Sequence, residues 1–134
     1  MMAVAGAGAK GHPLDSAPSE PSIIRMSDRF QTFEEFWPFY LREHARPLTR
    51  TVHVAGTWAA ALVLLAGLFL GPWWLMLLAP VVGYGCAWVS HFFIERNRPA
   101  TFTYPAWSLR GDLLLAWLAS TGRLGAELRR HGVG

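Results

Sequence analysis

The feature that most constrains this chain is a run of 44 residues, 51–94, without a single Asp, Glu, Lys or Arg. A helix that crosses a bilayer needs roughly 20 apolar residues, so this run is long enough to cross twice. The 134 residues are also 52% hydrophobic and include seven tryptophans, which is too apolar for an ordinary small soluble domain. We therefore expect an all-α membrane protein.

Turn signals divide the run into two segments. "GPWW" at 71–74 separates an apolar segment at about 52–70 from a second one at about 73–94. Each is long enough for one span, so we expect a two-span helical hairpin. Pro80, Gly83 and Gly85 in the second segment predict either a kink or close packing of helices.

An amphipathic helix is predicted on each side of the hairpin. In "TFEEFWPFYLREH", apolar residues recur at helical spacing, Thr32 is a good N-cap and Glu35 completes a capping box. Pro38 is expected to kink or restart this helix. From Asp112 onward the pattern is again helical, but its apolar part is too short to span. Both helices should lie at the membrane interface, with a third, partial span as the alternative.

The composition of the N-terminus differs from that of the rest. Residues 1–26 are rich in Ala, Gly, Pro and Ser and have no hydrophobic periodicity, which predicts a disordered tail. Residues 27–134 then form a single membrane-embedded domain, since the length has room for one. Met26 is a candidate for the biological start, in which case His12 has no function.

The arginines predict orientation. They flank the apolar run at Arg42, Arg46 and Arg50 before it and at Arg96, Arg98 and Arg110 after it, and the turn between the spans has none. The positive-inside rule therefore places both termini of an integral membrane protein in the cytoplasm. The bilayer is the predicted partner of this basic surface. Nucleic acid is not, because no stretch interleaves bases with aromatics.

The hairpin brings two histidines to one depth. His53 lies 17 residues before Leu70, and His91 lies 18 residues after Trp73. At about 1.5 Å per residue, both lie about 26 to 27 Å from the turn. A tight turn at 71–72 should therefore place them together at the cytoplasmic end.

Two further residues adjoin this pair. His44 is nine residues before His53 across a proline-containing break and can fold back to the same level, and Glu95 shares a helix face with His91. Histidines with a carboxylate suit a divalent metal such as iron or zinc. The alternative is that each is an interfacial packing residue, with Glu95 paired to a neighbouring arginine. His131, like His12, lies in a tail-like segment and is given no role.

The segments "FEEFWPFYLREHARPLTRTVHVAGT" and "GYGCAWVSHFFIERNRPATFTYPAWSLRGD" carry a resemblance to a known family. Over residues 30–118 the chain resembles the small membrane proteins whose yeast member is a 2-hydroxy fatty acid dioxygenase of the endoplasmic reticulum. It departs from the yeast type in having one histidine where that motif has two adjacent ones, and in having fewer spans. Its "TFTYPAWSLRGD" segment is similar to a bacterial branch, whose substrate need not be the same. This similarity implies a protein of a bacterial inner membrane.

The resemblance implies an iron(II)-dependent dioxygenase of fatty acid α-oxidation, which shortens a 2-hydroxy fatty acid by one carbon and releases carbon dioxide. Fe²⁺ would be its cofactor, and the hydroxy acid and dioxygen its substrates. By matching motif, His44, His53 and His91 are the candidate iron ligands. Glu95 would be a further ligand or would orient one. Arg98 would pair with the substrate carboxylate or face lipid phosphate.

Two other functions fit the same residues. In a non-catalytic membrane protein, the polar cluster and the small residues would only tie the helices together. In a b-type haem protein, His53 and His91 would be the axial ligands, because the hairpin places them at equal depth.

Overall fold

The computed structural model describes residues 29–134, and the predictions about the 1–26 tail, His12 and Met26 lie outside the described residues. The described part is helical and contains no strand. Its elements are α1 (Phe33–Glu43), α2 (Pro47–Leu70), α3 (Trp74–Val89), the π-helix η2 (Ser90–Glu95), the 3-10 helix η3 (Ala100–Phe102), α4 (Pro105–Ser120) and α5 (Leu124–Arg130).

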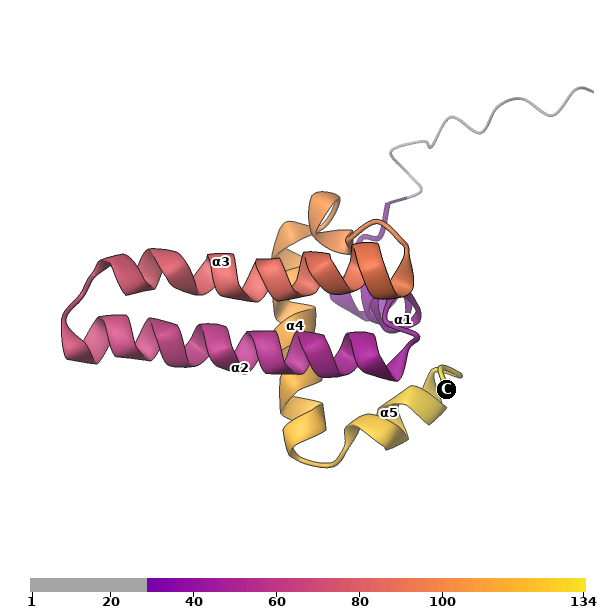
Figure 1. The fold of residues 1–134 in the computed structure, drawn as a ribbon. Helices are drawn as coiled ribbons and strands as arrows, with labels where there is room; N and C mark the ends of the chain where they lie inside the picture. Colours follow the sequence, from indigo (N-terminus) through magenta and orange to yellow (C-terminus); the bar gives the residue numbers. More distant parts are fainter. Residues whose placement is uncertain (1–28) are drawn as a thin grey trace, which may run out of the picture.

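Helices α2 and α3 form the predicted hairpin and lie side by side (Figure 1). Gly71 ends α2 with φ 102°, a left-handed conformation that glycine adopts at little cost and that lets the chain reverse. Two segments are long and apolar enough to cross a membrane, Pro47–Leu70 and Trp74–Glu95. The second matches the predicted 73–94 closely.

The outer surface of the hairpin is apolar. In the most apolar 18-residue stretch of each segment, only 17% (Pro47–Leu70) and 22% (Trp74–Glu95) is buried inside the protein. Neither segment is therefore the core helix of a soluble fold. Exposed large side chains cover both helices, among them Leu62, Leu68, Phe69, Trp73 and Leu77. Soluble proteins rarely expose so continuous an apolar surface, and lipid is the surrounding that accommodates it. The prediction of an all-α membrane protein is confirmed.

Small residues set the spacing within the hairpin. A Cβ added at Gly56 would lie 2.5 Å from the Cβ of Cys86, and one added at Gly83 would lie 3.3 Å from the Cβ of Ala60. The close packing predicted for Gly83 is therefore confirmed. The same prediction for Gly85 is wrong, because a Cβ there would meet nothing within 4 Å. Helix α3 continues across Pro80 without a break.

The first span begins earlier than predicted. Helix α2 starts at Pro47 rather than at about residue 52, because proline suits the first position of a helix, where no N–H is needed. The break after α1 is correspondingly short. Arg50 lies inside α2 as a result, and its guanidinium folds back to donate hydrogen bonds to the carbonyl oxygens of His44 (2.8 Å) and Ala45 (2.7 Å).

The predicted flanking helix α1 is present. Thr32 caps it, since its Oγ1 accepts a hydrogen bond from the Glu35 N–H at 3.2 Å. Glu35 accepts from the N–H of Gln31 (2.9 Å) rather than from that of Thr32, so the capping box is displaced by one residue. Pro38 lies within α1 and does not end it.

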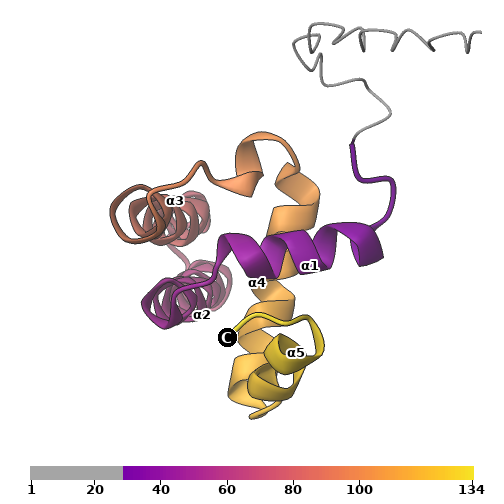
Figure 2. The ribbon, with the colours of Figure 1, turned by 90° about the vertical axis from the view of Figure 1, so that its right-hand side faces the viewer.

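Helices α1, α4 and α5 gather over the half of the hairpin that lies away from its turn, with α1 passing across α4 (Figure 2). Half of the residues in their shared core are aromatic; the core contains Phe33, Phe36, Trp37, Tyr40, Leu41, Ala100, Leu115 and Val133. The apolar face of α1 is thus covered by protein. The prediction that this face lies at the membrane interface is wrong, because α4 and α5 supply a core that is not visible in the sequence.

Helix α4 runs across the hairpin rather than along it (Figure 1). It has 16 residues, fewer than the roughly 20 that a helix needs to cross a bilayer. If the hairpin crosses the bilayer, a helix lying across its axis lies near the membrane plane. This arrangement favours the predicted interfacial helix over the alternative of a third, partial span.

Candidate metal centre

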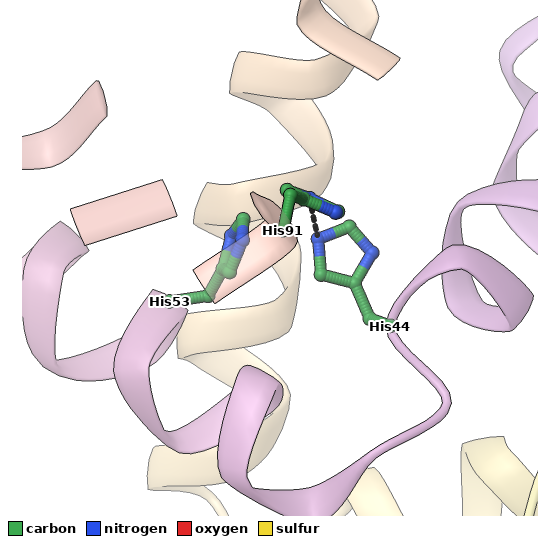
Figure 3. A group of neighbouring side chains, drawn as sticks. All are labelled: His44, His53 and His91. Carbon is green, nitrogen blue, oxygen red and sulfur yellow. Dashed lines mark hydrogen bonds between the residues drawn. The ribbon is translucent and has the colours of Figure 1, made fainter. Parts of the chain in front are cut away.

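Three buried histidines meet at the end of the hairpin that α1 and α4 cover. His44 follows α1, His53 lies in α2 and His91 lies in η2, and one ring nitrogen of each lies within 4.8 Å of those of the other two. Their ring centroids are 4.3 Å (His44 to His53), 4.6 Å (His44 to His91) and 5.0 Å (His53 to His91) apart. Figure 3 shows the rings facing one another across a small space. The predicted convergence is confirmed.

Each Nδ1 is held by an oxygen on the outer side of the cluster. That of His44 lies 2.6 Å from the carbonyl oxygen of Tyr40. That of His53 lies 2.8 Å from Oδ1 of Asp112, and that of His91 lies 2.7 Å from Oδ1 of Asn97. A carbonyl and a carboxylate only accept, so the Nδ1 atoms of His44 and His53 carry hydrogen.

Asn97 is oriented by its own partners. Its Nδ2 donates to the carbonyl oxygen of Glu43 at 3.1 Å and to Oε2 of Glu43 at 2.8 Å. The amide oxygen must therefore be the atom that faces His91, and Nδ1 of His91 is the donor. In their neutral forms, all three imidazoles then present an unprotonated Nε2.

The Nε2 atoms consequently face inward as lone-pair donors. Those of His44 and His91 are 3.2 Å apart, and with both Nδ1 atoms protonated neither has a hydrogen to give the other. Nε2 of His53 is buried and has no hydrogen-bond partner among residues 29–134. Two nitrogens bound to one metal at about 2.0–2.1 Å in tetrahedral geometry lie roughly 3.3 Å apart. The spacing of the His44 and His91 nitrogens matches this value, and the ligand nitrogens of all three histidines lie within 4.8 Å of one another, so the group could hold a divalent cation.

The charge state of His44 also suits a metal. Burial lowers the pKa of His44 well below its usual value, and the neighbouring His53 and His91 lower it further. At neutral pH the ring is therefore uncharged and its lone pair is free to bind a cation.

A polar network supports His53 from the far side. Oδ1 of Asp112 accepts from Nδ1 of His53 and from the hydroxyl of Tyr40, whose ring stacks on His44 with centroids 4.0 Å apart. A carboxylate behind a histidine fixes its tautomer and makes the opposite nitrogen a better ligand. Gly111 lets Tyr40 approach, since a Cβ there would lie 2.8 Å from the Tyr40 ring.

The local backbone presents His91. The last six residues of the second span, Ser90–Glu95, form a π-helix, which is rare and often found at functional sites. Arg96 ends it in a left-handed conformation with φ 61°. The N–H groups of Arg96 and Asn97 both bond to the His91 carbonyl oxygen, so Asn97 is carried back toward the ring that it orients.

The other predicted site residues lie elsewhere. Oε1 of Glu95 accepts from the backbone N–H of Arg46 at 2.7 Å, which ties η2 to the start of α2. The guanidinium of Arg98 is exposed and lies 5.4 Å from the centroid of the Phe102 ring. Within the described part of the chain, neither side chain has a hydrogen bond to the three imidazoles. His131 bonds to Glu127 in the last turn, away from the cluster.

Sequence reasoning missed the residues that hold the histidines in place. Asp112 carried one signal, since it is a lone acid that opens an apolar helical segment. Asn97 lies beside Arg96 and Arg98 and looks like part of a polar loop. The carbonyl of Tyr40 carries no sequence signal at all.

Comparison of the sequence with known protein families identifies the family of this chain. A family model described as 2-hydroxy-palmitic acid dioxygenase Mpo1-like matches residues 30–124. The chain belongs to the Mpo1-like family. The match includes all three histidines together with Asn97 and Asp112, and it confirms the resemblance seen in the sequence. No curated protein and no solved structure matches the chain.

Proposed function

We propose that this protein is an iron(II)-dependent membrane dioxygenase that removes one carbon from 2-hydroxy fatty acids. One observation supports the metal centre above all. Three buried imidazoles bring ring nitrogens within 4.8 Å of one another, while an oxygen acceptor holds each Nδ1 and leaves Nε2 free for a metal. Membership of the Mpo1-like family supports the substrate class and the reaction type.

The histidines, the residues that orient them and the covering helices each have a distinct proposed role. His44, His53 and His91 would hold the iron, and Asp112 and Asn97 would keep two of the rings in the metal-binding tautomer. Bound iron(II) would supply a centre at which dioxygen meets the hydroxyl and carboxylate oxygens of the substrate. The covering helices α1 and α4 bury the cluster and keep bulk water from it.

The overall reaction balances without an external reductant. One 2-hydroxy acid and one dioxygen give an acid one carbon shorter, one carbon dioxide and one water. The bond between the first two carbons breaks, the substrate loses four electrons and dioxygen gains them. No flavin or nicotinamide is required.

Glu95 and Arg98 are proposed to act at the edge of the site. Through its bond to the N–H of Arg46, Glu95 would position the short segment that carries His44, as a positioning residue rather than a ligand. Arg98 is exposed beside Phe102, which suits an anchor at the lipid head groups or an entry point for the substrate carboxylate.

The proposed setting is a bacterial inner membrane with both termini in the cytoplasm. The arginines that flank the spans gather at the end of the hairpin that holds the cluster, as the positive-inside rule requires of a cytoplasmic end.

Of the two alternatives, a b-type haem site fits poorly. The His53 and His91 centroids are only 5.0 Å apart, and His44 lies 4.3 and 4.6 Å from them, where the macrocycle would have to extend. A packing-only cluster leaves the facing Nε2 atoms of His44 and His91 without a hydrogen to share.

Turnover by the metal-loaded protein tests the proposal. The full chain is purified anaerobically, loaded with iron(II) and given 2-hydroxypalmitate with dioxygen. We expect a fatty acid one carbon shorter and an equal amount of carbon dioxide, with no product from palmitate. Loaded protein that converts no 2-hydroxy acid of any chain length would overturn the proposed reaction.

A further inference from the structure

A cavity opens beside the histidine cluster and extends along the hairpin. Its volume is about 340 Å³, within the range of small-molecule sites. It is lined by α2 (His53, Thr57, Ala60, Ala61 and Leu64), by α3 (Ala79, Pro80, Gly83, Tyr84 and Ala87) and by α4 (Leu109, Asp112 and Leu113). The cavity therefore includes one metal-ligand candidate and the carboxylate behind it.

The polarity of the lining changes along its length. His53, Thr57 and Asp112 provide most of the polar groups and lie at the end near the cluster. Toward the turn of the hairpin the walls are apolar, and the small residues there leave the space between larger neighbours. A molecule with a polar head and an apolar tail would match this gradient.

The length of the cavity can be worked out from the helix that lines it. From His53 to Leu64 the α2 lining covers 11 residues, which at about 1.5 Å per residue is roughly 16 Å. An extended chain advances about 1.2 Å per bond, judged from the roughly 3.3–3.6 Å that three backbone bonds span. About 13 carbons of an extended chain therefore fit between the cluster and Leu64.

We propose that this cavity holds the acyl chain of a long-chain 2-hydroxy acid, with its head group at the His53 end. This inference rests on the proposed function for the identity of the head group. Ala61 would then set the chain length, because it lines the cavity eight residues beyond His53, or roughly 12 Å along the helix. A bulky residue there would leave room for about 10 carbons.

A matched pair of variants tests the chain-length role. Ala61→Phe should lower kcat/KM for 2-hydroxypalmitate at least about tenfold and leave that for 2-hydroxyoctanoate within about twofold. Leu62→Phe is the control, since Leu62 is the next residue and is 66% exposed on the outer surface. It should change neither value. Iron content should equal that of the wild type in both variants, because neither residue touches the imidazoles.

A photo-crosslinking experiment provides a readout that does not depend on turnover. A 2-hydroxypalmitate analogue with a diazirine at the far end of its chain is bound anaerobically to the iron-loaded full chain in micelles. We expect the label to map by mass spectrometry to the far end of the cavity, around Leu64 and Pro80. Label confined to Leu62 and Leu68, which are 66% and 62% exposed on the outer surface, would overturn the inference.

The two proposals fail in different ways. If the label maps to the cavity but no 2-hydroxy acid is converted, the proposed reaction is wrong and the acyl site stands. If wild type and Ala61→Phe convert 2-hydroxypalmitate equally well, the reaction stands and the acyl site is wrong.

Discussion

The Asp112→Asn variant tests whether the Asp112 carboxylate makes His53 a better metal ligand. One oxygen of Asp112 accepts hydrogen bonds from Nδ1 of His53 and from the Tyr40 hydroxyl. A hydrogen bond to a charged group contributes about 1.5–3 kcal/mol and one between neutral groups about 0.5–1.5 kcal/mol. Asparagine keeps an acceptor oxygen but loses the charge. The substitution should therefore weaken the hydrogen bonding that orients His53 by about 1–2 kcal/mol.

That cost should appear in metal affinity. A loss of about 1–2 kcal/mol corresponds to roughly 5- to 30-fold in a dissociation constant, which overlaps the 10–100-fold usually found for such partners. The measurement is a competition titration of iron(II) against a chelator of known affinity, with wild type and variant in the same detergent.

Glu127→Gln is the matched control. Its Oε1 also accepts from an aromatic side chain, Nε1 of Trp37 at 2.9 Å, and from a histidine, His131 at 3.0 Å, but it lies outside the cluster. The iron affinity of this variant should equal that of the wild type. If Asp112→Asn also binds iron as tightly as the wild type, then this carboxylate does not make His53 a better ligand.

Three further predictions follow from the fold and the cluster. Gly56→Ala should lower stability by about 1–3 kcal/mol, because its Cβ would lie 2.5 Å from that of Cys86, whereas Gly85→Ala should be neutral or slightly stabilising; equal Tm values in detergent would contradict the packing account. Reporter fusions should place Pro72 outside and a C-terminal fusion in the cytoplasm, and a cytoplasmic signal from Pro72 would refute the proposed orientation. Because the pKa of His44 is lowered in the folded protein, the unfolded chain binds more protons than the folded one below about pH 6.5. The Tm of the metal-free protein should therefore fall as the pH drops below this value. A Tm that stays flat or rises between pH 7 and 5 would show that His44 is not buried as a neutral ring.

The sequence was sufficient to predict the hairpin and the meeting of the histidines. Both follow from simple geometry, because a charge-free run of this length must form two spans and a tight turn brings His53 and His91 to equal depth. The return of His44 was also predicted, since Pro47 limits how far α1 can continue.

The supporting residues could not be predicted in the same way. Asp112 is 59 residues from His53, and only the crossing of α4 over the hairpin brings the two together. The burial of α1 likewise depends on α4 and α5, whose own apolar stripes are too short to identify a core. The π-helix has no sequence signature, although it determines how His91 and Asn97 face each other.

Glu95 illustrates the limit of helical spacing. Its position one turn after His91 places it on the same face in an ordinary α-helix, which favoured it as a fourth member of the site. In the π-helix the residues per turn differ, and the carboxylate instead bonds to the N–H of Arg46. A regular helix was assumed where the chain forms an irregular one.

The metal content of single histidine variants tests whether His44, His53 and His91 together bind one iron. The full chain and the variants His44→Ala, His53→Ala, His91→Ala and His131→Ala are expressed with iron, purified anaerobically and analysed for bound metal per chain. We expect about one iron per chain in the wild type and in His131→Ala, and a loss of most of it in each of the other three variants. Full metal content in all three cluster variants, or wild-type protein that binds no iron under these conditions, would contradict it.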